Sequence, residues 1–480
     1  MAASIAGWPV LLPPVLAIAL ALSTRQIYLA LFAGLWLGTT LLVGGNPIVG
    51  LERLGTELVA VFADPGNTRI VFFCLLVGGL IALVQASGGV LGFIQWMQRR
   101  GLGTSRRGAE LLAWLTGMVV FVESSITSLA VGAVNRPLFD KLKLPREKLA
   151  YYCDATSAPV CMMIPLNGWG AYVLGLLAAQ GVGADAIGLL LSALAFNLFA
   201  ILAIVFALLL ALTGWSFGPM AAAERRARET GQLIRAGSRP MISEEVALIA
   251  PAPDVVPRAV HFLGPLAVMM LMMLVSLWIT GAGDLTAGSG STAVLWSVSL
   301  AIGWSLVTTA LPIGDGPVLG LRPGTDLVLK GMAGLLGPTI LIVFAFALGQ
   351  VSRALEMGPY VVGLFGSGFP AWCLPAMIFL AGCVVSFTLG SSWTTFAILV
   401  PLALPLAEGL GVPPALMLGA VLSGGIYGDH SSPLSDTSII SSMAAACDHV
   451  DHVNTQLPYT LLLAGAAFVG FLLLGWGLTP

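Results

Sequence analysis

The residues best suited to do chemistry in this chain lie in one short run, from Gly428 to Thr437, inside a strongly apolar stretch. The run holds two carboxylates, Asp429 and Asp436, together with His430 and several hydroxyl side chains. A charge at membrane depth is costly, so it persists where it lines a pathway or holds an ion. Carboxylate, hydroxyl and carbonyl oxygens suit a hard cation such as Na⁺. The run therefore predicts a buried cation site.

A similar pattern occurs in the first half of the chain. Residues 152–159 read YCDATSAP and match residues 427–433, which read YGDHSSP, with one inserted residue. The match places Asp154 in the position of Asp429. A buried acidic site that occurs twice is typical of transporters built from two repeats. Asp154 is therefore a third candidate ligand for the cation.

The composition indicates a membrane protein. Of the 480 residues, 58% are hydrophobic and 9% are charged, whereas a soluble domain carries about 25% charged residues. Several uncharged runs reach the length that spans a lipid bilayer as a helix. The net charge of −2 argues against a nucleic-acid partner. We expect an all-α polytopic protein.

The sequence carries no pattern for nucleophilic catalysis, for a nucleotide-phosphate loop or for dinucleotide binding. We therefore expect a transporter driven by ion gradients rather than an enzyme. No cofactor is expected beyond the coupling ions Na⁺ and H⁺.

Residues 214–261 form a long hydrophilic interval with five arginines between positions 225 and 239 and with prolines after them. This composition predicts a flexible linker, and the positive-inside rule places it in the cytoplasm. The linker divides the chain into residues 1–213 and 262–480.

Two basic loops, around 99–107 and 136–148, flank the apolar run 111–135. If both loops are cytoplasmic, the run must cross the membrane an even number of times, and it is too short for two full spans. It could form two half-helices that enter and return, with a tip near Glu123, Ser124 and Ser125. The alternative is one ordinary span with a basic loop outside.

A second hairpin is predicted at 371–409, because residues 391–397 (SSWTTFA) resemble residues 124–130 (SSITSLA). Carrying the topology through the cytoplasmic linker makes this hairpin enter from the opposite side. We therefore expect two repeats of inverted topology whose hairpin tips approach each other near mid-membrane.

Each hairpin is followed by an apolar run that proline and glycine interrupt, at 149–178 and at 414–446. Such breaks free backbone carbonyls and amides for an ion. Further candidates are hydroxyl or amide side chains near the breaks and the hairpin tips: Ser431, Ser432, Thr437, Thr156, Ser157, Ser124, Ser125, Ser391, Ser392, Thr394 and Asn167. The alternative for these side chains is that they satisfy broken backbone, and the alternative for the aspartates is helix capping.

Residues 448–452 read DHVDH and bring nitrogen and oxygen ligands together. The predicted topology puts them at the cytoplasmic end of the second broken helix. We interpret them as a structural or pH-responsive boundary rather than as a metal site.

Taken together, residues 428–442 and 447–459 resemble the signature of the NhaC family of Na⁺/H⁺ antiporters. The segments 146–160 and 169–172 are also similar to that family, and 391–396 resembles its second hairpin. The resemblance implies the ion transporter superfamily architecture, with a scaffold domain and an elevator-like transport domain. It also implies a multi-pass protein of the bacterial inner membrane.

One departure from the family concerns the first hairpin, where Glu123 and Ser124 replace the usual pair of aspartates. On the first hypothesis the chain is a Na⁺/H⁺ antiporter in which Asp429, Asp436 and Asp154 bind Na⁺, with Glu123 or His430 assisting proton exchange. On the alternative it is a Na⁺- or H⁺-coupled transporter of a small organic solute, an amino acid or a carboxylate, held by the hairpin tips. The oligomeric state stays open, a homodimer included.

Overall fold

The computed structural model describes residues 7–24, 26–99, 105–121, 123–165, 167–182, 185–240, 255–284, 288–311, 319–356, 360 and 370–479. Every regular element within these residues is helical. Seven of the described helices are long and apolar enough to cross a membrane, and the number rises to nine if each of two bent helix pairs counts as one span. The prediction of an all-α polytopic membrane protein is confirmed.

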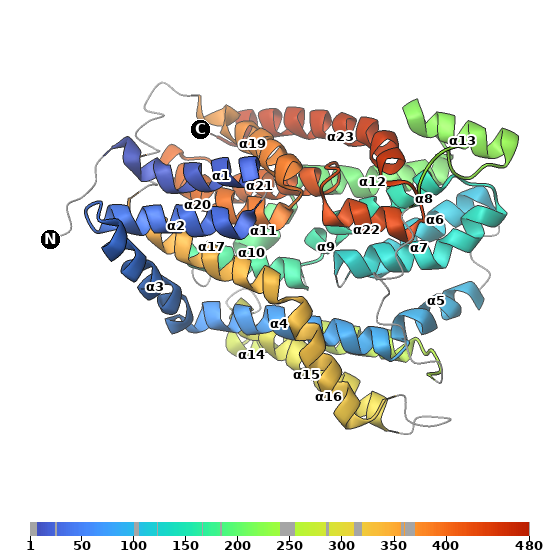
Figure 1. The fold of residues 1–480 in the computed structure, drawn as a ribbon, viewed down its shortest axis with the longest axis horizontal. Helices are drawn as coiled ribbons and strands as arrows, with labels where there is room; N and C mark the ends of the chain where they lie inside the picture. The colour runs from blue at the N-terminus through green and yellow to red at the C-terminus, as the bar shows by residue number, and fades with distance from the viewer. Residues whose placement is uncertain are drawn as a thin grey trace.

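The first helices begin at the left-hand end of the molecule in this view and reach its right-hand end along the lower side (Figure 1). They are a short 3₁₀ turn η1 (Trp8–Leu11), α1 (Leu12–Thr24), α2 (Ile27–Leu42), α3 (Pro47–Ala63), α4 (Pro65–Ala86) and α5 (Gly89–Arg99). The chain bends by 112° between α2 and α3. Asn46 caps α3 by accepting the N–H groups of Ile48 and Val49, which stabilises the new helix direction.

The next helices contain the first predicted hairpin and the first broken helix. They are α6 (Arg106–Val119), α7 (Ser124–Lys141), α8 (Arg146–Ala155), α9 (Ala158–Met163), α10 (Gly168–Ala179), α11 (Ala186–Leu194), α12 (Leu198–Thr213) and α13 (Gly218–Thr230). Helices α6 and α7 pack against each other. The helix that begins at Arg146 ends at Ala155 and resumes at Ala158, just before Pro159, which has no N–H to continue the hydrogen-bond ladder.

The second half contains the second predicted hairpin and the second broken helix. Its helices are α14 (Val260–Thr280), α15 (Gly290–Ala310), α16 (Leu321–Gly334), α17 (Leu336–Ala354), the short turn η4 (Ala371–Cys373), α19 (Leu374–Leu389), α20 (Ser392–Leu410), α21 (Pro414–Asp429), α22 (Asp436–Ala444) and α23 (His449–Leu478). Helices α19 and α20 pack together, and α21 and α22 are separated by residues 430–435. The helix breaks thus lie inside the predicted segments 149–178 and 414–446.

Gly390 lies in the turn of the second hairpin, where it packs against the second helix break. It ends α19 with φ +65°, a conformation that favours glycine. A Cβ atom built there would lie 2.6 Å from the carbonyl carbon of Leu434, in the break between α21 and α22. The turn of the hairpin therefore packs directly on the broken backbone.

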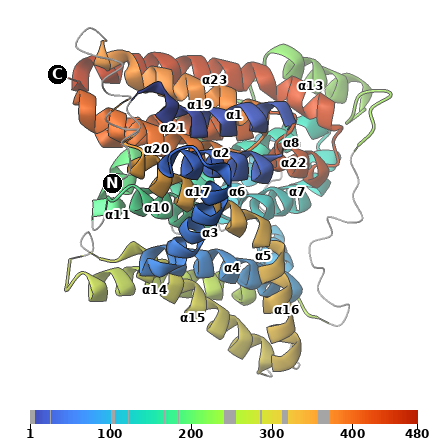
Figure 2. The same ribbon diagram turned by 60° about the vertical axis from the view of Figure 1, so that its left-hand side comes forward.

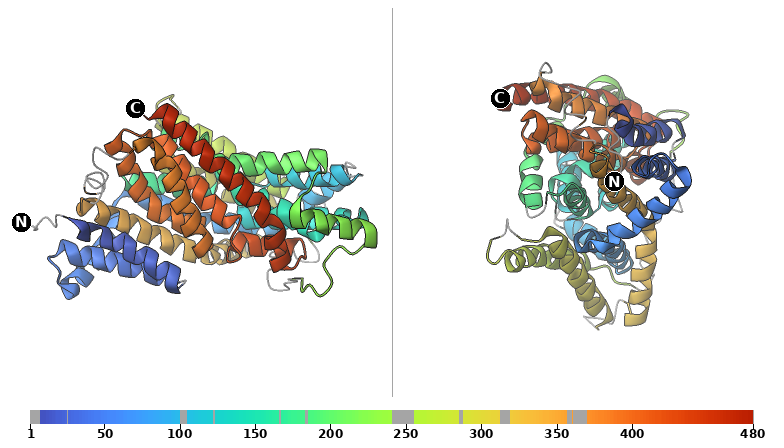
Figure 3. Two further views of the ribbon diagram at one scale, coloured as in Figure 1. Left: turned by 90° about the horizontal axis from the view of Figure 1, so that it is seen from above. Right: turned by 90° about the vertical axis from the view of Figure 1, so that its left-hand side faces the viewer.

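Two groups of helices are visible in the figures. Helices α4, α14, α15 and α16 form a layer on one side, and α19 to α23 lie with α6, α7, α8 and α12 on the other (Figures 1 and 2). Figure 3 shows the long helix α23 lying across the second group, where it contacts α12 and α19.

The membrane placement of these elements stays a prediction: the re-entrant hairpins, the inverted repeats, the cytoplasmic loops and the elevator-type division. Each arm of the second hairpin, α19 with η4 and α20, is by itself long and apolar enough for a full crossing.

The expectation of a flexible linker is wrong for its first part. Residues 218–230 form α13, and Arg226 on this helix donates to both carboxylate oxygens of Glu147, at 2.8 and 3.0 Å. The backbone N–H of Arg146 also donates to the carbonyl of Leu233, at 3.0 Å. Ion pairs with α8 therefore order this part of the interval, which composition alone had suggested would be mobile. Residues 241–254 lie outside the described residues.

Candidate functional site

Asp154 lies on the last turn of α8 and is fully buried. Its Oδ2 atom accepts hydrogen bonds from Ser438 Oγ at 2.8 Å and from Gln456 Nε2 at 2.6 Å. Two imidazoles approach the same oxygen, with His430 Nδ1 and His452 Nε2 each at 3.4 Å. All four partners come from the second half of the chain, so the two halves meet at this carboxylate.

Asp429 is the last residue of α21 and is also buried. Its Oδ1 atom accepts the backbone N–H of Ser392 at 3.2 Å, and its Oδ2 atom accepts the hydroxyl of Ser392. Ser392 is the first residue of α20. The tip of the second hairpin therefore holds the carboxylate of the second broken helix.

Ser438 on α22 connects the two aspartates. Its hydroxyl oxygen lies 2.8 Å from Asp154 Oδ2 and 3.0 Å from the backbone carbonyl oxygen of Asp429. A hydroxyl has one hydrogen to donate, so Ser438 serves one of these acceptors at a time. The same carbonyl is approached by Thr437 Oγ1 at 3.2 Å, because α21 ends there and leaves its last carbonyls without helical partners.

Several buried atoms around Asp154 have no hydrogen-bond partner within the described part of the chain. They are Asp154 Oδ1, His430 Nε2, His452 Nδ1 and Gln456 Oε1. Buried polar atoms are normally paired. Their concentration at one carboxylate marks a site that can take additional ligands, and the free oxygens suit a hard cation.

The other predicted hydroxyls mostly contact backbone. Thr156 donates to the carbonyl of Tyr152 at 2.7 Å, and Ser157 donates to that of Asp154 at 2.8 Å. Ser432 accepts the N–H of Leu434 at 3.1 Å. These contacts fit the alternative interpretation, in which the hydroxyl groups form hydrogen bonds with backbone groups near the helix breaks.

At the tip of the second hairpin, Ser391 caps α20 by accepting the N–H and the hydroxyl of Thr394, at 3.3 and 3.1 Å. Ser431 is buried directly after His430.

Asn167 and the two hairpin tips meet at the start of α10. The amide of Asn167 donates to the carbonyl of Phe121 beside the first tip, at 2.8 Å, and its oxygen caps α10 by accepting the N–H of Trp169 at 2.9 Å. On the other side the ring of Trp393, at the second tip, stacks on Tyr172 with centroids 4.5 Å apart. Both tips thus contact one segment, and their approach at mid-membrane stays a prediction.

Glu123 lies at the first tip, where its Oε1 atom accepts the hydroxyl of Ser124 at 3.0 Å. The side chains of Ser125 and Asp436 lie outside the described residues, although their backbones belong to α7 and α22. The binding roles of all predicted site residues stay predictions.

The interpretation of residues 448–452 as a boundary is wrong for His452. Asp448 accepts the backbone N–H of Arg239 at 2.8 Å, and Asp451 pairs with Arg235 at 2.9 Å, so the boundary stays a prediction for these two residues. His452 instead points to Asp154 from a fully buried position. Within the described residues no group of three or more His, Cys, Asp and Glu side chains could hold a metal ion.

Sequence analysis missed Ser438, His452 and Gln456. One signal was available for two of them: His452 and Gln456 are four residues apart, so they lie on one face of α23.

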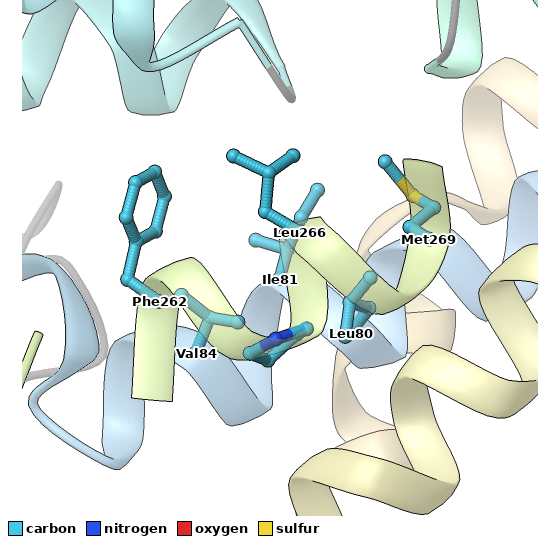
Figure 4. A pocket seen from close by; sticks show the side chains of 7 residues that line it. Leu80, Ile81, Val84, Phe262, Leu266 and Met269 are labelled. Atoms are coloured by element: carbon cyan, nitrogen blue, oxygen red, sulfur yellow. The ribbon is translucent and has the colours of Figure 1, made fainter. Parts of the chain in front are cut away.

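A second buried group of charges lies at the other end of α8. Lys148 Nζ pairs with Glu110 Oε2 at 2.8 Å and with Glu224, and it is 1% exposed. Tyr152 donates to the same Glu110 oxygen at 3.0 Å, and Ser216 donates to Glu224 at 3.0 Å. By contrast, an apolar pocket between α4 and α14 is lined by carbon and sulfur side chains and offers no ion ligand (Figure 4).

Comparisons with known proteins give four findings. The sequence profile of the Na⁺/H⁺ antiporter family matches residues 160–476. An uncharacterized protein of Haemophilus influenzae is 32% identical over 97% of this chain and 90% of its own length. The Na⁺/H⁺ antiporter NhaC of Alkalihalophilus pseudofirmus is 29% identical over 38% of this chain and 36% of its own. Among solved structures, the fold is similar to the YdaH transporter of Alcanivorax borkumensis, with a TM-score of 0.54, 16% identity and 90% of each chain covered.

Proposed function

Because this chain belongs to the Na⁺/H⁺ antiporter family, we propose that it exchanges Na⁺ for H⁺ across the bacterial inner membrane by alternating access. The observation that carries the proposal is the pair of buried aspartates at the two helix breaks, Asp154 and Asp429, which Ser438 connects.

Exchange follows from the electrostatics of this pair. A buried carboxylate cannot remain uncompensated, because it has lost its hydration. Na⁺ and H⁺ can each neutralise the same charge, so the binding of one lowers the occupancy of the other. His430 is suited to take part, since it follows Asp429 in the chain and its ring contacts Asp154.

The packing around the breaks supports alternating access. Helix α7 of the first hairpin packs on α22, and α20 of the second hairpin packs on α21. Both hairpins therefore contact the broken helix that carries Asp429. We propose that this group moves as a unit against the layer of α4, α14, α15 and α16.

The proposal is tested with purified protein in proteoliposomes, by ²²Na⁺ uptake against an imposed pH gradient. Asp429→Asn should keep the fold and abolish Na⁺-dependent proton movement, because the amide keeps the shape but not the charge. Glu123→Gln should reduce transport less. Asp326→Asn, at an exposed position on α16, is the matched control. Wild-type rates with unchanged Na⁺ and pH dependence in both test variants would show that the carboxylate site is wrong.

A panel of amino acids and carboxylates in the same vesicles tests the coupled uptake of an organic solute. If Asp429→Asn still moves such a solute but no longer responds to Na⁺, the protein is a coupled solute carrier and the exchange proposal fails.

A further inference from the structure

The carboxamide of Gln456 occupies an unusual position between the two halves of the chain. Gln456 lies on α23, outside both broken helices, and is 1% exposed. Its Nε2 atom lies 2.6 Å from Asp154 Oδ2, in the first half, and 2.6 Å from the backbone carbonyl oxygen of His430, at the second break.

These two contacts fix the orientation of the amide. An amide nitrogen carries two hydrogens, and the two short contacts use both of them. The ring atom His430 Nδ1, at 3.3 Å, therefore receives no hydrogen from Gln456. The flipped amide would set its oxygen against a carboxylate oxygen and a carbonyl oxygen, which repel it. The hydrogen-bond network thus assigns Nε2 to this side.

The oxygen of the same amide has no such contacts within the described part of the chain. Gln456 Oε1 is buried, and the described residues supply no donor to it. The same is true of Asp154 Oδ1, on the carboxylate to which Gln456 is bonded. A buried acceptor left without a partner costs about 1–3 kcal/mol. Two such oxygens, on side chains joined by a hydrogen bond, are ligands of the type that a hard cation takes.

We propose that Gln456 Oε1 and Asp154 Oδ1 together bind the transported alkali cation, and that Gln456 thereby sets the preference for Na⁺. The inference rests on the proposed function and adds a ligand from α23 to it. A neutral amide oxygen coordinates a metal ion but binds a proton far more weakly than a carboxylate does. Gln456 therefore strengthens the binding of Na⁺ without strengthening that of H⁺.

Two substitutions separate the oxygen ligand from the hydrogen-bond donor. Gln456→Met keeps the length of the side chain and removes both groups. Gln456→Glu keeps the oxygen and, when protonated next to Asp154, still donates one hydrogen bond. Gln350→Met, at a half-buried position on α17, is the matched control.

The measurement is equilibrium ²²Na⁺ binding to the purified full chain in detergent, with competition by Li⁺ and K⁺. We expect Gln456→Met to weaken binding at least 10-fold and to reduce the discrimination between Na⁺ and the competing ions. Gln456→Glu should stay within about threefold of the wild type. Wild-type affinity and selectivity in Gln456→Met would overturn the proposal, as would an equal loss in both variants, because Gln456 would then act only as a donor.

An infrared measurement on the wild-type chain tests the ligand directly, and one variant assigns the band. With ¹³C-labelled glutamine side chains, Na⁺ should shift one buried amide carbonyl band in the infrared difference spectrum, and Gln456→Glu should remove it. A spectrum without that band would overturn the inference while leaving antiport intact. A wild-type protein that binds no ²²Na⁺ would overturn the proposed function together with the inference.

Discussion

Helix α8 carries two buried charged residues, Lys148 and Asp154, which differ in how completely the surrounding hydrogen-bonding atoms are paired. At its first turn Lys148 is enclosed by Glu110 and Glu224, and Tyr152 and Ser216 supply further hydrogen bonds. None of these side chains has an unpaired buried atom in the described structure. At its last turn Asp154 has, among the described residues, four partners on one oxygen and none on the other. Three of those partners have unpaired atoms of their own.

The difference separates a structural network from an exchange site. A buried ion pair tolerates its desolvation only when its donors and acceptors are satisfied, and the Lys148 network meets this condition. A group that binds and releases ions has to keep lone pairs available in at least one state. The unpaired atoms around Asp154 are therefore consistent with a role in transport. The fully paired atoms around Lys148 are consistent with a structural role, in which this network holds α6, α8 and α13 together.

The largest effect is expected at Lys148. Lys148→Met should leave two carboxylates, Glu110 and Glu224, buried without their shared cation and destabilise the protein by about 3–5 kcal/mol. Thermal unfolding in detergent measures this, with Lys141→Met at an exposed position as the control. Equal melting temperatures for the two variants would show that the Lys148 network does not stabilise the fold.

Asp154→Asn should have the opposite profile. The amide fits the same space, so the melting temperature should change little, whereas Na⁺/H⁺ exchange should fall by about 100-fold or more, equivalent to about 2.7 kcal/mol. Exchange in proteoliposomes and thermal unfolding are measured on the same preparation. A destabilisation as large as that of Lys148→Met would mean that Asp154 is structural as well.

A smaller loss of stability is expected where α13 meets α8. Arg226→Met leaves Glu147, which is 2% exposed, without its cation, and should cost about 2 kcal/mol. Adding Glu147→Gln should recover part of that loss, because no buried charge then remains. The double-mutant cycle measures the coupling; additive losses would show that the pair does not hold the linker.

The smallest effect concerns the N-cap of α23. Partial burial, which would raise the pKa of Asp448, is outweighed by the N–H groups of Arg239, Asp451 and Val450, which lower it. The cap therefore stabilises the fold above the unfolded pKa of about 3.9, and this stability is lost as the pH falls through the folded value.

Asp448→Ala should cost about 1 kcal/mol at neutral pH, and Asp448→Asn, which also caps helices well, should cost less. Unfolding measured between pH 3 and 7 checks both. A pH dependence that is the same in wild type and Asp448→Asn would contradict the assignment.

The sequence by itself determined the elements and their interruptions. Long apolar runs can only be helices in a bilayer, and proline and glycine within such runs place the breaks beside Asp154 and Asp429. The repeated YxD pattern was sufficient to identify both aspartates as candidates, because a buried acidic residue that occurs twice is typical of transporters built from two repeats.

Only the tertiary structure decided which side chains surround the carboxylates. Gln456 and His452 reach Asp154 from a terminal helix far along the chain, and local periodicity reports which face of α23 is buried but not what it contacts. Glu224 pairs with Lys148 across 76 residues, so a basic interval that looked like a flexible linker is partly ordered. The physical reason is the same in both cases: hydrogen bonds within a helix follow from the sequence nearby, whereas the partner of a buried charge is set by how the helices pack.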